Sequence, residues 1–318
     1  MSNKPIYVEL AIDASLDELW KYTQSPELHE QWDLRFSEIR YLPKANESDN
    51  QKFVYRTRIG FGLRIEGTGE SAVIMKNNRK DRLSTLAFAS DQRLSLIRQG
   101  GGFWKYEQRQ PGQPVTFSTL YDYRTRFGPA GRLFDRWLFR PLFGFATAWS
   151  FDRLRLWLEE RVPPSVTAER ALIHYCSVML LLLLWCFEGI VPKLLFPESG
   201  EMALLGGTGW FAGAEREAVR LLGLGEVAFG VAAAILHRKR WAHLAQLAAL
   251  LLLTIPALAF NSGIMAEPFN PLTLLLPMAG LCMAAYWTAR QLPDARRCRR
   301  RPAANPRKAR RRSNEIDL

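Results

Sequence analysis

The chain has 318 residues, a net charge of +12 and a mean hydropathy of −0.13, an average that is typical of a soluble protein. The four cysteines form no CxxC pair and have no metal-ligand spacing, so we predict no metal site. Residues 289–318 hold 11 basic and 3 acidic residues, a net charge of +8 out of the chain's +12. Because the positive charge gathers at the C-terminal end and not on a binding face, we expect no nucleic-acid partner.

The first half, residues 1–161, has the pattern of a water-soluble α+β domain. Segment 6–12 alternates and is rich in β-formers, which predicts a first strand. Ser15 and Glu18 have the spacing of a capping box, and Pro26 suits the first turn of a second helix. Further strands are predicted at 37–42, 52–59, 63–75, 82–88, 94–97, 103–109 and 115–125. A helical pattern, kinked at Pro141, then runs from Pro129 to Arg161.

Two segments in this half resemble the SRPBCC superfamily, which has the START-like helix-grip fold of polyketide cyclases and lipid-transfer domains. They are IDASLDELWKYTQSPELHEQWD (12–33) and PLFGFATAWSFDRLRLWLEE (141–160). The resemblance implies an antiparallel sheet wrapped around a long C-terminal helix, with an apolar cavity for a small apolar ligand. The candidate lining residues are Trp20, Trp32, Phe143, Trp149 and Phe151, and the alternative for each is plain core packing.

His29 and Asp33 are weak candidates for a catalytic pair. They lie four residues apart, so on a helix they share a face and can form a general base. No serine or cysteine nucleophile stands in a motif context. Ligand binding is therefore the favoured function of this domain, and whether it is an enzyme stays open.

The second half is membrane-embedded by composition. Long apolar runs occur at 171–196, 218–236, 241–260 and 271–289, each long enough to be a candidate for one helical crossing of a bilayer. We therefore predict a linker at 162–170 and a four-helix transmembrane domain at 171–290. A basic tail at 291–318, which includes the cluster Arg307–Arg312, is predicted to be disordered and to contact anionic lipid.

The charged residues in the segments that flank the four apolar runs predict how the helices are oriented across the membrane. The connection 237–240 and the C-terminal tail are strongly basic, whereas the other two connections are acidic on balance. The positive-inside rule then places both termini in the cytoplasm, which agrees with the lack of a signal-peptide pattern at residues 1–10. We expect a multi-pass protein of a bacterial-type inner membrane.

The membrane half resembles the DoxX-like family of small four-helix membrane proteins. The matching strings are FEGIVPKLLFP (187–197), GLGEVAFG (223–230) and PFNPLTLLLP (268–277). The resemblance implies a membrane component of an oxidoreductase system, linked in some members to quinone chemistry. No haem, iron–sulfur, dinucleotide or P-loop motif is present in the sequence, so the redox cofactor would belong to a partner protein.

Ionisable residues inside apolar runs are costly and point to function. We predict a polar cluster of Glu188, Lys193, Glu226 and Asn270 in the outer half of the bundle. It is either a site for a quinone or another amphiphile headgroup, or a structural clamp between helices. Two functions follow: a module in which the soluble domain binds and transfers a lipid-like or quinone-like molecule, and an oxidoreductase subunit with a quinone-type site in the bundle.

Overall fold

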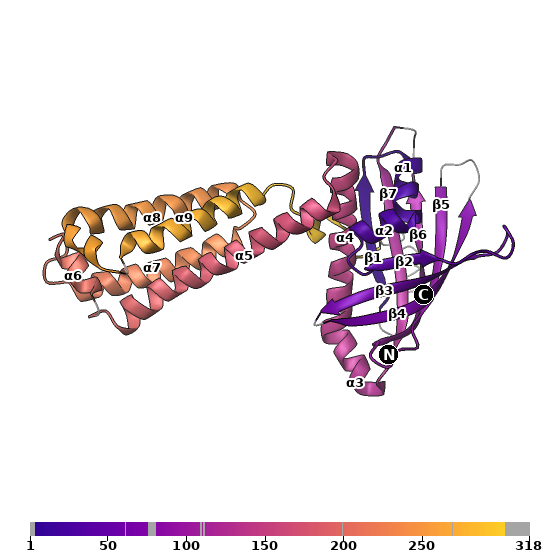
Figure 1. The fold of residues 1–318 in the computed structure, drawn as a ribbon, viewed down its shortest axis with the longest axis horizontal. Coiled ribbons are helices and arrows are strands. Elements are labelled where there is room, and N and C mark those ends of the chain that lie inside the picture. The colour runs from indigo at the N-terminus through magenta and orange to yellow at the C-terminus, as the bar shows by residue number, and fades with distance from the viewer. Residues whose placement is uncertain are drawn as a thin grey trace, which may run out of the picture. The chain divides into compact units, whose positions relative to one another are not determined.

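The computed structural model describes residues 4–302 apart from 61, 76–80, 109, 111, 199 and 269. It divides into two compact units (Figure 1). The first contains the described residues up to Ser165 and again from Pro293, and the second runs from Val166 to Leu292. The two units correspond to the soluble and apolar halves of the sequence.

In the described part of the first unit, seven antiparallel strands form one sheet in the order β1-β7-β6-β5-β4-β3-β2. Helices α1 (Leu16–Gln24) and α2 (Pro26–Trp32) connect β1 to β2, and the long helix α4 (Arg140–Glu160) packs against β1 and α2. This arrangement confirms the predicted helix-grip fold. The strands are β1 (Ile6–Ile12), β2 (Glu38–Tyr41), β3 (Gln51–Gly60), β4 (Leu63–Met75), β5 (Asp81–Ala89), β6 (Ile97–Glu107) and β7 (Val115–Thr125).

Local sequence signals explain the helices of this unit. The Ser15 hydroxyl accepts a hydrogen bond from the Glu18 amide at 3.1 Å and caps α1, and Pro26 occupies the first turn of α2. The core lies between the inner face of the sheet and α4, where Phe117 and Phe151 stack with ring centroids 4.4 Å apart. Both side chains are fully buried.

Strand β6 differs from the prediction of two short strands at 94–97 and 103–109, of which Arg109 lies outside the described residues. Gly100, Gly101 and Gly102 lie between the two predicted strands, and in the structure they are paired inside the ladder of one strand. A Cβ on Gly100 would lie 2.6 Å from the Phe88 ring, and one on Gly102 would lie 2.3 Å from the Leu120 carbonyl oxygen. The glycines therefore make room for close neighbours and do not end the strand.

The helical segment predicted at 129–161 contains a π-helical turn, and it ends just before the predicted linker. Helix α3 (Gly128–Phe134) is followed by a π-helical turn, η2 (Asp135–Phe139), and then by α4. Helix α4 ends at Glu160 with Arg161 in the left-handed conformation, and α5 begins at Pro164. The predicted linker at 162–170 is therefore mostly helical, because Pro164 starts a helix as readily as it ends one.

The second unit has four helices long and apolar enough to cross a membrane among the described residues, at Pro164–Leu195, Glu215–Ile235, Arg240–Phe260 and Pro271–Thr288. They are α5 (Pro164–Glu188) continued by the π-helical turns of η3 (Gly189–Leu195), α7 (Glu215–Ile235), α8 (Arg240–Phe260) and α9 (Pro271–Thr288). Short helices α6 (Glu201–Gly206) and η4 (Ser262–Ala266) lie in the connections. Leu181, Trp185, Leu250, Met278 and Cys282 form the buried core of the bundle.

The segment from Pro293 to Pro302 is ordered and belongs to the first unit, which corrects the predicted disordered tail for these residues. Arg299 forms a β-bridge with Glu9 of β1, through two backbone hydrogen bonds of 2.9 Å. The buried Cys298 thiol donates to the Ala148 carbonyl of α4. Residues 303–318, with the cluster Arg307–Arg312, lie outside the described residues.

Candidate functional site

The polar cluster of the membrane unit is organised by Lys193, at the C-terminal end of the first span. Pro192 has no N–H, so it cannot donate to the Glu188 carbonyl four residues earlier, as an α-helix would require. The chain continues instead in the π-helical turns of η3, where each amide donates to the carbonyl five residues earlier. Lys193 Nζ also donates to the Glu188 carbonyl oxygen at 3.3 Å, so the Glu-Gly-x-x-Pro-Lys string forms a π-helical end with the lysine side chain folded back on it.

Two glycines bring this turn close to α7. A Cβ on Gly189 would lie 2.5 Å from the Gly223 carbonyl oxygen, and one on Gly223 would lie equally close to the Gly189 carbonyl oxygen. Such close backbone approach between membrane helices is typical of paired small residues. It places Lys193 against the α7 turn that carries Glu226.

Lys193 is paired with two carboxylates. Its Nζ lies 3.1 Å from Glu226 Oε2 and 3.3 Å from Glu201 Oε1. Lys193 and Glu226 are only 5 % and 6 % exposed, so the ion pair is largely shielded from solvent. Glu201 comes from α6 and was not predicted, because an acidic residue in an apparent loop carries no sequence signal for burial.

These charges line a cavity of about 920 Å³ within the membrane unit. The wall is otherwise mainly apolar and aromatic, with Trp185, Trp210, Phe211 and Met278 among the lining residues. All four predicted cluster residues, Glu188, Lys193, Glu226 and Asn270, line it together with Glu201. An apolar cavity with a few convergent polar groups is the usual form of a small-molecule site.

The four predicted residues do not contribute in the same way. Lys193 and Glu226 form the ion pair, whereas Glu188 is bonded to Lys193 through its backbone carbonyl. Asn270 caps α9, accepting from the backbone amides of Leu272 and Thr273. A side chain that satisfies a helix terminus is a structural part of the wall, so the charged centre consists of Lys193, Glu226 and Glu201.

A chain of hydrogen bonds that the sequence did not reveal leads from this wall to the α7–α8 connection. The Trp185 indole N–H donates to Gln246 Oε1 at 3.1 Å, and the Gln246 amide lies 3.4 Å from His243 Nδ1. His243 Nε2 then lies 2.8 Å from the His237 carbonyl oxygen. A tryptophan N–H and a backbone carbonyl at the two ends fix the direction of donation, so His243 is the Nε2–H tautomer.

His174 completes this group. Its Nδ1 lies 3.1 Å from the Ala285 carbonyl oxygen, and its Nε2 lies 3.0 Å from His237 Nδ1. His174 and His243 are buried from solvent, and both nitrogens of each ring lie within hydrogen-bonding distance of another group. The i, i+3 spacing of His243 and Gln246 was the available signal, and it was too common to single out.

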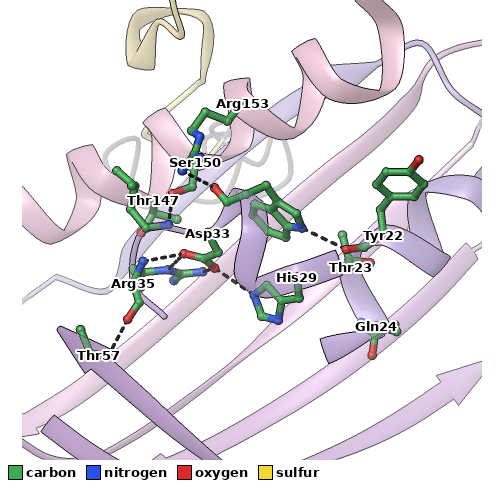
Figure 2. A network of polar contacts seen from close by, with 12 residues as sticks. Tyr22, Thr23, Gln24, His29, Asp33, Arg35, Thr57, Thr147, Ser150 and Arg153 are labelled. Atoms are coloured by element: carbon green, nitrogen blue, oxygen red, sulfur yellow. Dashed lines mark hydrogen bonds and ion pairs between the residues drawn. The ribbon is translucent and has the colours of Figure 1, made fainter. Parts of the chain in front are cut away.

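In the first unit, the candidate pair His29 and Asp33 is brought together. His29 Nε2 lies 3.0 Å from Asp33 Oδ2, as Figure 2 shows. Arg35, which was not predicted, donates to both Asp33 oxygens through Nε at 2.9 Å and Nη2 at 2.6 Å. The buried carboxylate is thus shared between an imidazole and a guanidinium.

Burial and pairing shift the pKa values of these groups. Burial lowers the pKa of His29 below its ordinary value, and the hydrogen bond to Asp33 only partly offsets this. For Asp33, burial would raise the pKa, but the charge and hydrogen bonds of Arg35 outweigh it and hold that pKa well below its usual range. A fully buried carboxylate bound to Arg35 is suited to holding the fold, not to taking a proton from a substrate.

The five aromatic residues predicted to line a ligand cavity pack against other side chains. Trp32 and Phe151 are fully buried and lie 6.1 Å apart, centroid to centroid. Phe143 stacks on Phe139, and Trp20 contacts Tyr106. Trp149 lies against the Arg153 guanidinium. These contacts match the core-packing alternative.

A second cavity, of about 680 Å³, lies in the first unit and is lined by none of those five residues. Its wall crosses five strands, from Phe53 on β3 to Tyr123 on β7, and includes Gly69 and Gly100. Lys52, Glu70 and Arg124 add charge to the wall. Among the described residues, no group of three or more His, Cys, Asp or Glu side chains could hold a metal ion.

Comparison with known proteins places the chain in a family. The model of the DoxX-like family matches residues 182–283. The uncharacterized membrane protein YndG of Bacillus subtilis (strain 168) is 50 % identical over 189 residues, which are 59 % of this chain and 70 % of YndG. The chain belongs to the DoxX-like family. The DoxX-like region contains Glu188, Lys193, Glu201 and Glu226, so the charged centre of the cavity lies within the matched residues.

Solved structures also match about half of this DoxX-like protein. A conserved protein from Geobacillus kaustophilus is 8 % identical with a TM-score of 0.36, covering 49 % of this chain and 95 % of its own. The di-domain ARO/CYC StfQ of the steffimycin biosynthetic pathway is 12 % identical with a TM-score of 0.35, covering 49 % of this chain and 51 % of its own. This DoxX-like protein is a membrane protein with an N-terminal helix-grip domain.

Proposed function

We propose that the membrane unit binds the polar headgroup of an amphiphile in the cavity beside Lys193. The observation that supports this most is an ion pair of Lys193 and Glu226 on the wall of a mainly apolar cavity of about 920 Å³. A structural clamp alone would need no adjoining space. A cavity of this size is in the range that holds a small organic ligand.

The chemistry of the wall favours a headgroup with oxygen atoms that accept and donate hydrogen bonds. The Lys193 ammonium can donate to a carbonyl oxygen, and the Glu226 and Glu201 carboxylates can accept from a hydroxyl. A quinone has the carbonyls, its quinol has the hydroxyls, and its tail suits the apolar wall. In this proposal the chain is a membrane subunit of an oxidoreductase system, and a partner protein supplies the electrons.

Binding is tested with the purified full chain in detergent and a short-chain ubiquinone as the probe. Trp185 and Trp210 line the cavity, so a bound quinone should quench tryptophan emission in a saturable way. We expect Lys193→Met combined with Glu226→Gln, which leaves neither partner of the buried ion pair alone, to weaken binding by at least about tenfold, the size of one lost charge-assisted hydrogen bond. Glu198→Gln is the control, because Glu198 pairs with the exposed Arg216 and does not line the cavity. Non-saturable quenching, or equal binding by all three proteins, would refute the proposal.

Ligand binding and transfer by the helix-grip domain is the second candidate. It is favoured by the cavity of about 680 Å³ across β3 to β7. One observation argues against this second candidate: the side chains of Trp32, Phe117 and Phe151 fill the space between the sheet and α4, where the ligand of a helix-grip domain would lie. Lipid extraction of the purified full chain separates the candidates: a lipid retained in Lys193→Met but lost in Ala87→Trp, which fills the cavity from an exposed position on β5, would favour the sheet.

We also infer that both termini face the cytoplasm. Arg238, Lys239 and Arg240 gather at the α7–α8 connection, whereas Glu198, Glu201 and Glu267 lie in the other two connections. A cysteine placed at Lys239 should react with a membrane-impermeant maleimide only after cells are opened. One placed at Glu267 should react in intact spheroplasts. The reverse pattern would invert the topology.

A further inference from the structure

One face of the first unit exposes a group of large apolar side chains to solvent. It is formed by α3, η2 and the first turns of α4, which Figure 1 shows as a continuous helical run along the sheet unit. Trp137 is 73 % exposed, the largest value on this face. The other exposed apolar side chains here are Leu133, Phe134, Leu138, Leu142 and Phe145.

The opposite side of the same helices fixes which residues point outward. Asp135 is fully buried and accepts hydrogen bonds from the Tyr123 hydroxyl at 2.7 Å and Arg140 Nε at 2.9 Å. Phe143 packs edge-on against Tyr123. These contacts prevent the helices from rotating to bury Trp137. The exposed apolar residues recur every three to four positions, which is the pattern of one helix face.

The charge on this face has one sign. Arg132 and Arg136 are exposed beside the apolar residues. The acidic residue of the same stretch, Asp135, is buried and paired with Arg140. An apolar helix face with tryptophan, phenylalanine and leucine, flanked by arginine and free of exposed acid in this stretch, complements an anionic bilayer surface.

We propose that this face, defined by Leu133, Phe134, Trp137, Leu138, Leu142 and Phe145, lies in the headgroup region of an anionic membrane. Four helices of the described chain are long and apolar enough to cross a membrane, and only Arg161, Val162 and Pro163 separate α4 from α5, the first of them. A lipid surface is therefore always within reach of this domain, at a high effective concentration. The proposal does not depend on the cavity beside Lys193.

The test uses the full chain in vesicles of phosphatidylcholine and phosphatidylglycerol. A nitroxide is attached to Leu138→Cys in a background with Cys176→Ser and Cys186→Ser, since the other two cysteines are buried. Collision rates with oxygen, which concentrates in lipid, are compared with those of a water-soluble nickel complex. We expect the oxygen-to-nickel ratio at this site to exceed that of a label at the exposed Glu47 by about fivefold or more, as for an interfacial helix.

The outcomes separate lipid from other partners. A ratio at Leu138→Cys equal to that at Glu47→Cys means that the face is in water and overturns the proposal. Low collision rates with both reagents, together with dipolar broadening between labels, mean that a second copy covers the face, and this overturns it too. A label at Leu142→Cys repeats the test in case the first variant misfolds. Adding Arg132→Glu and Arg136→Glu should lower the ratio towards that of Glu47→Cys.

Discussion

Lys193 Nζ lies 3.1 Å from Glu226 Oε2, and both side chains are almost completely buried between the end of the first span and α7. Neither partner is tolerable alone at this depth, because a buried charge without a counter-charge carries most of its desolvation cost. The pair is therefore interdependent, whatever ligand the adjoining cavity takes.

This interdependence predicts an asymmetry between single and double variants. Lys193→Met leaves two carboxylates without their cation and should lower the free energy of unfolding by about 3–5 kcal/mol. Glu226→Gln should cost less, because Glu201 still faces Lys193 at 3.3 Å. The double variant should be more stable than Lys193→Met alone. Thermal unfolding in detergent measures all three, and strictly additive losses would show that the two residues do not interact.

The glycine contact between η3 and α7 offers a matched pair of variants on one helix. A Cβ on Gly223 would lie 2.5 Å from the Gly189 carbonyl oxygen and 2.8 Å from Lys193 Cβ, whereas a Cβ on Gly225 meets nothing within 4 Å. Both substitutions to alanine gain about 1 kcal/mol of helix propensity. We expect Gly225→Ala to be neutral or stabilising and Gly223→Ala to be destabilising by about 1–3 kcal/mol. Equal effects in thermal unfolding would mean that the helices do not approach closely here.

Much of this architecture could be predicted from the sequence because it rests on periodic or local signals. The four apolar runs are continuous in the sequence. The capping residue Ser15 and the prolines at helix starts act within one turn of their helices. The cluster of Glu188, Lys193 and Glu226 was also accessible, since ionisable residues in apolar runs are rare. The sequence could not show which carboxylates pair with Lys193. In the structure these are Glu226 and also Glu201, which lies on a separate short helix.

Other features depend on contacts between distant segments. Nothing near Gly100 in the sequence shows that Phe88 on the neighbouring strand will occupy the space a side chain would need. Similarly, the bond between Trp185 and Gln246 joins residues 61 positions apart. Such long-range pairing leaves no local periodicity to read.

The buried pair His29 and Asp33 predicts how the stability of the first unit depends on pH. Burial lowers the pKa of His29 below its ordinary value of 6.5, so the folded state binds this proton more weakly than the unfolded state does. Its stabilising contribution is therefore complete above pH 6.5 and is lost as the pH falls below that value. The lowered pKa of Asp33 adds a second loss, which begins only near its ordinary value of 3.8.

His29→Gln separates the two effects. Glutamine can still donate to Asp33 but takes up no proton, so the loss of stability between about pH 7 and pH 5 should disappear while the loss at lower pH stays. The measurement is the thermal midpoint of the β-sheet circular dichroism signal of the full chain in detergent, at a series of pH values. An unchanged slope between pH 7 and pH 5 in the variant would assign that titration to another group.

The ordered segment Pro293–Pro302 predicts a stabilising role for residues that follow the last span. Arg299 bridges β1 through Glu9, the Asp294 amide donates to Asp152 Oδ2 at 2.7 Å, and Cys298 packs in a buried position on α4. A chain that stops after Leu292 loses all three contacts and exposes part of α4. Compared with a chain that stops after Pro302, it should unfold with a free energy lower by about 2–4 kcal/mol, because it loses four hydrogen bonds of this segment and exposes apolar surface.

Maleimide labelling at pH 8 gives an independent readout, because burial raises the pKa of the Cys298 thiol to about 12. Cys298 should stay unreactive in the chain ending at Pro302 and become reactive when Arg299→Pro removes the bridge, whereas rapid labelling in both would show that the segment does not pack on the sheet unit.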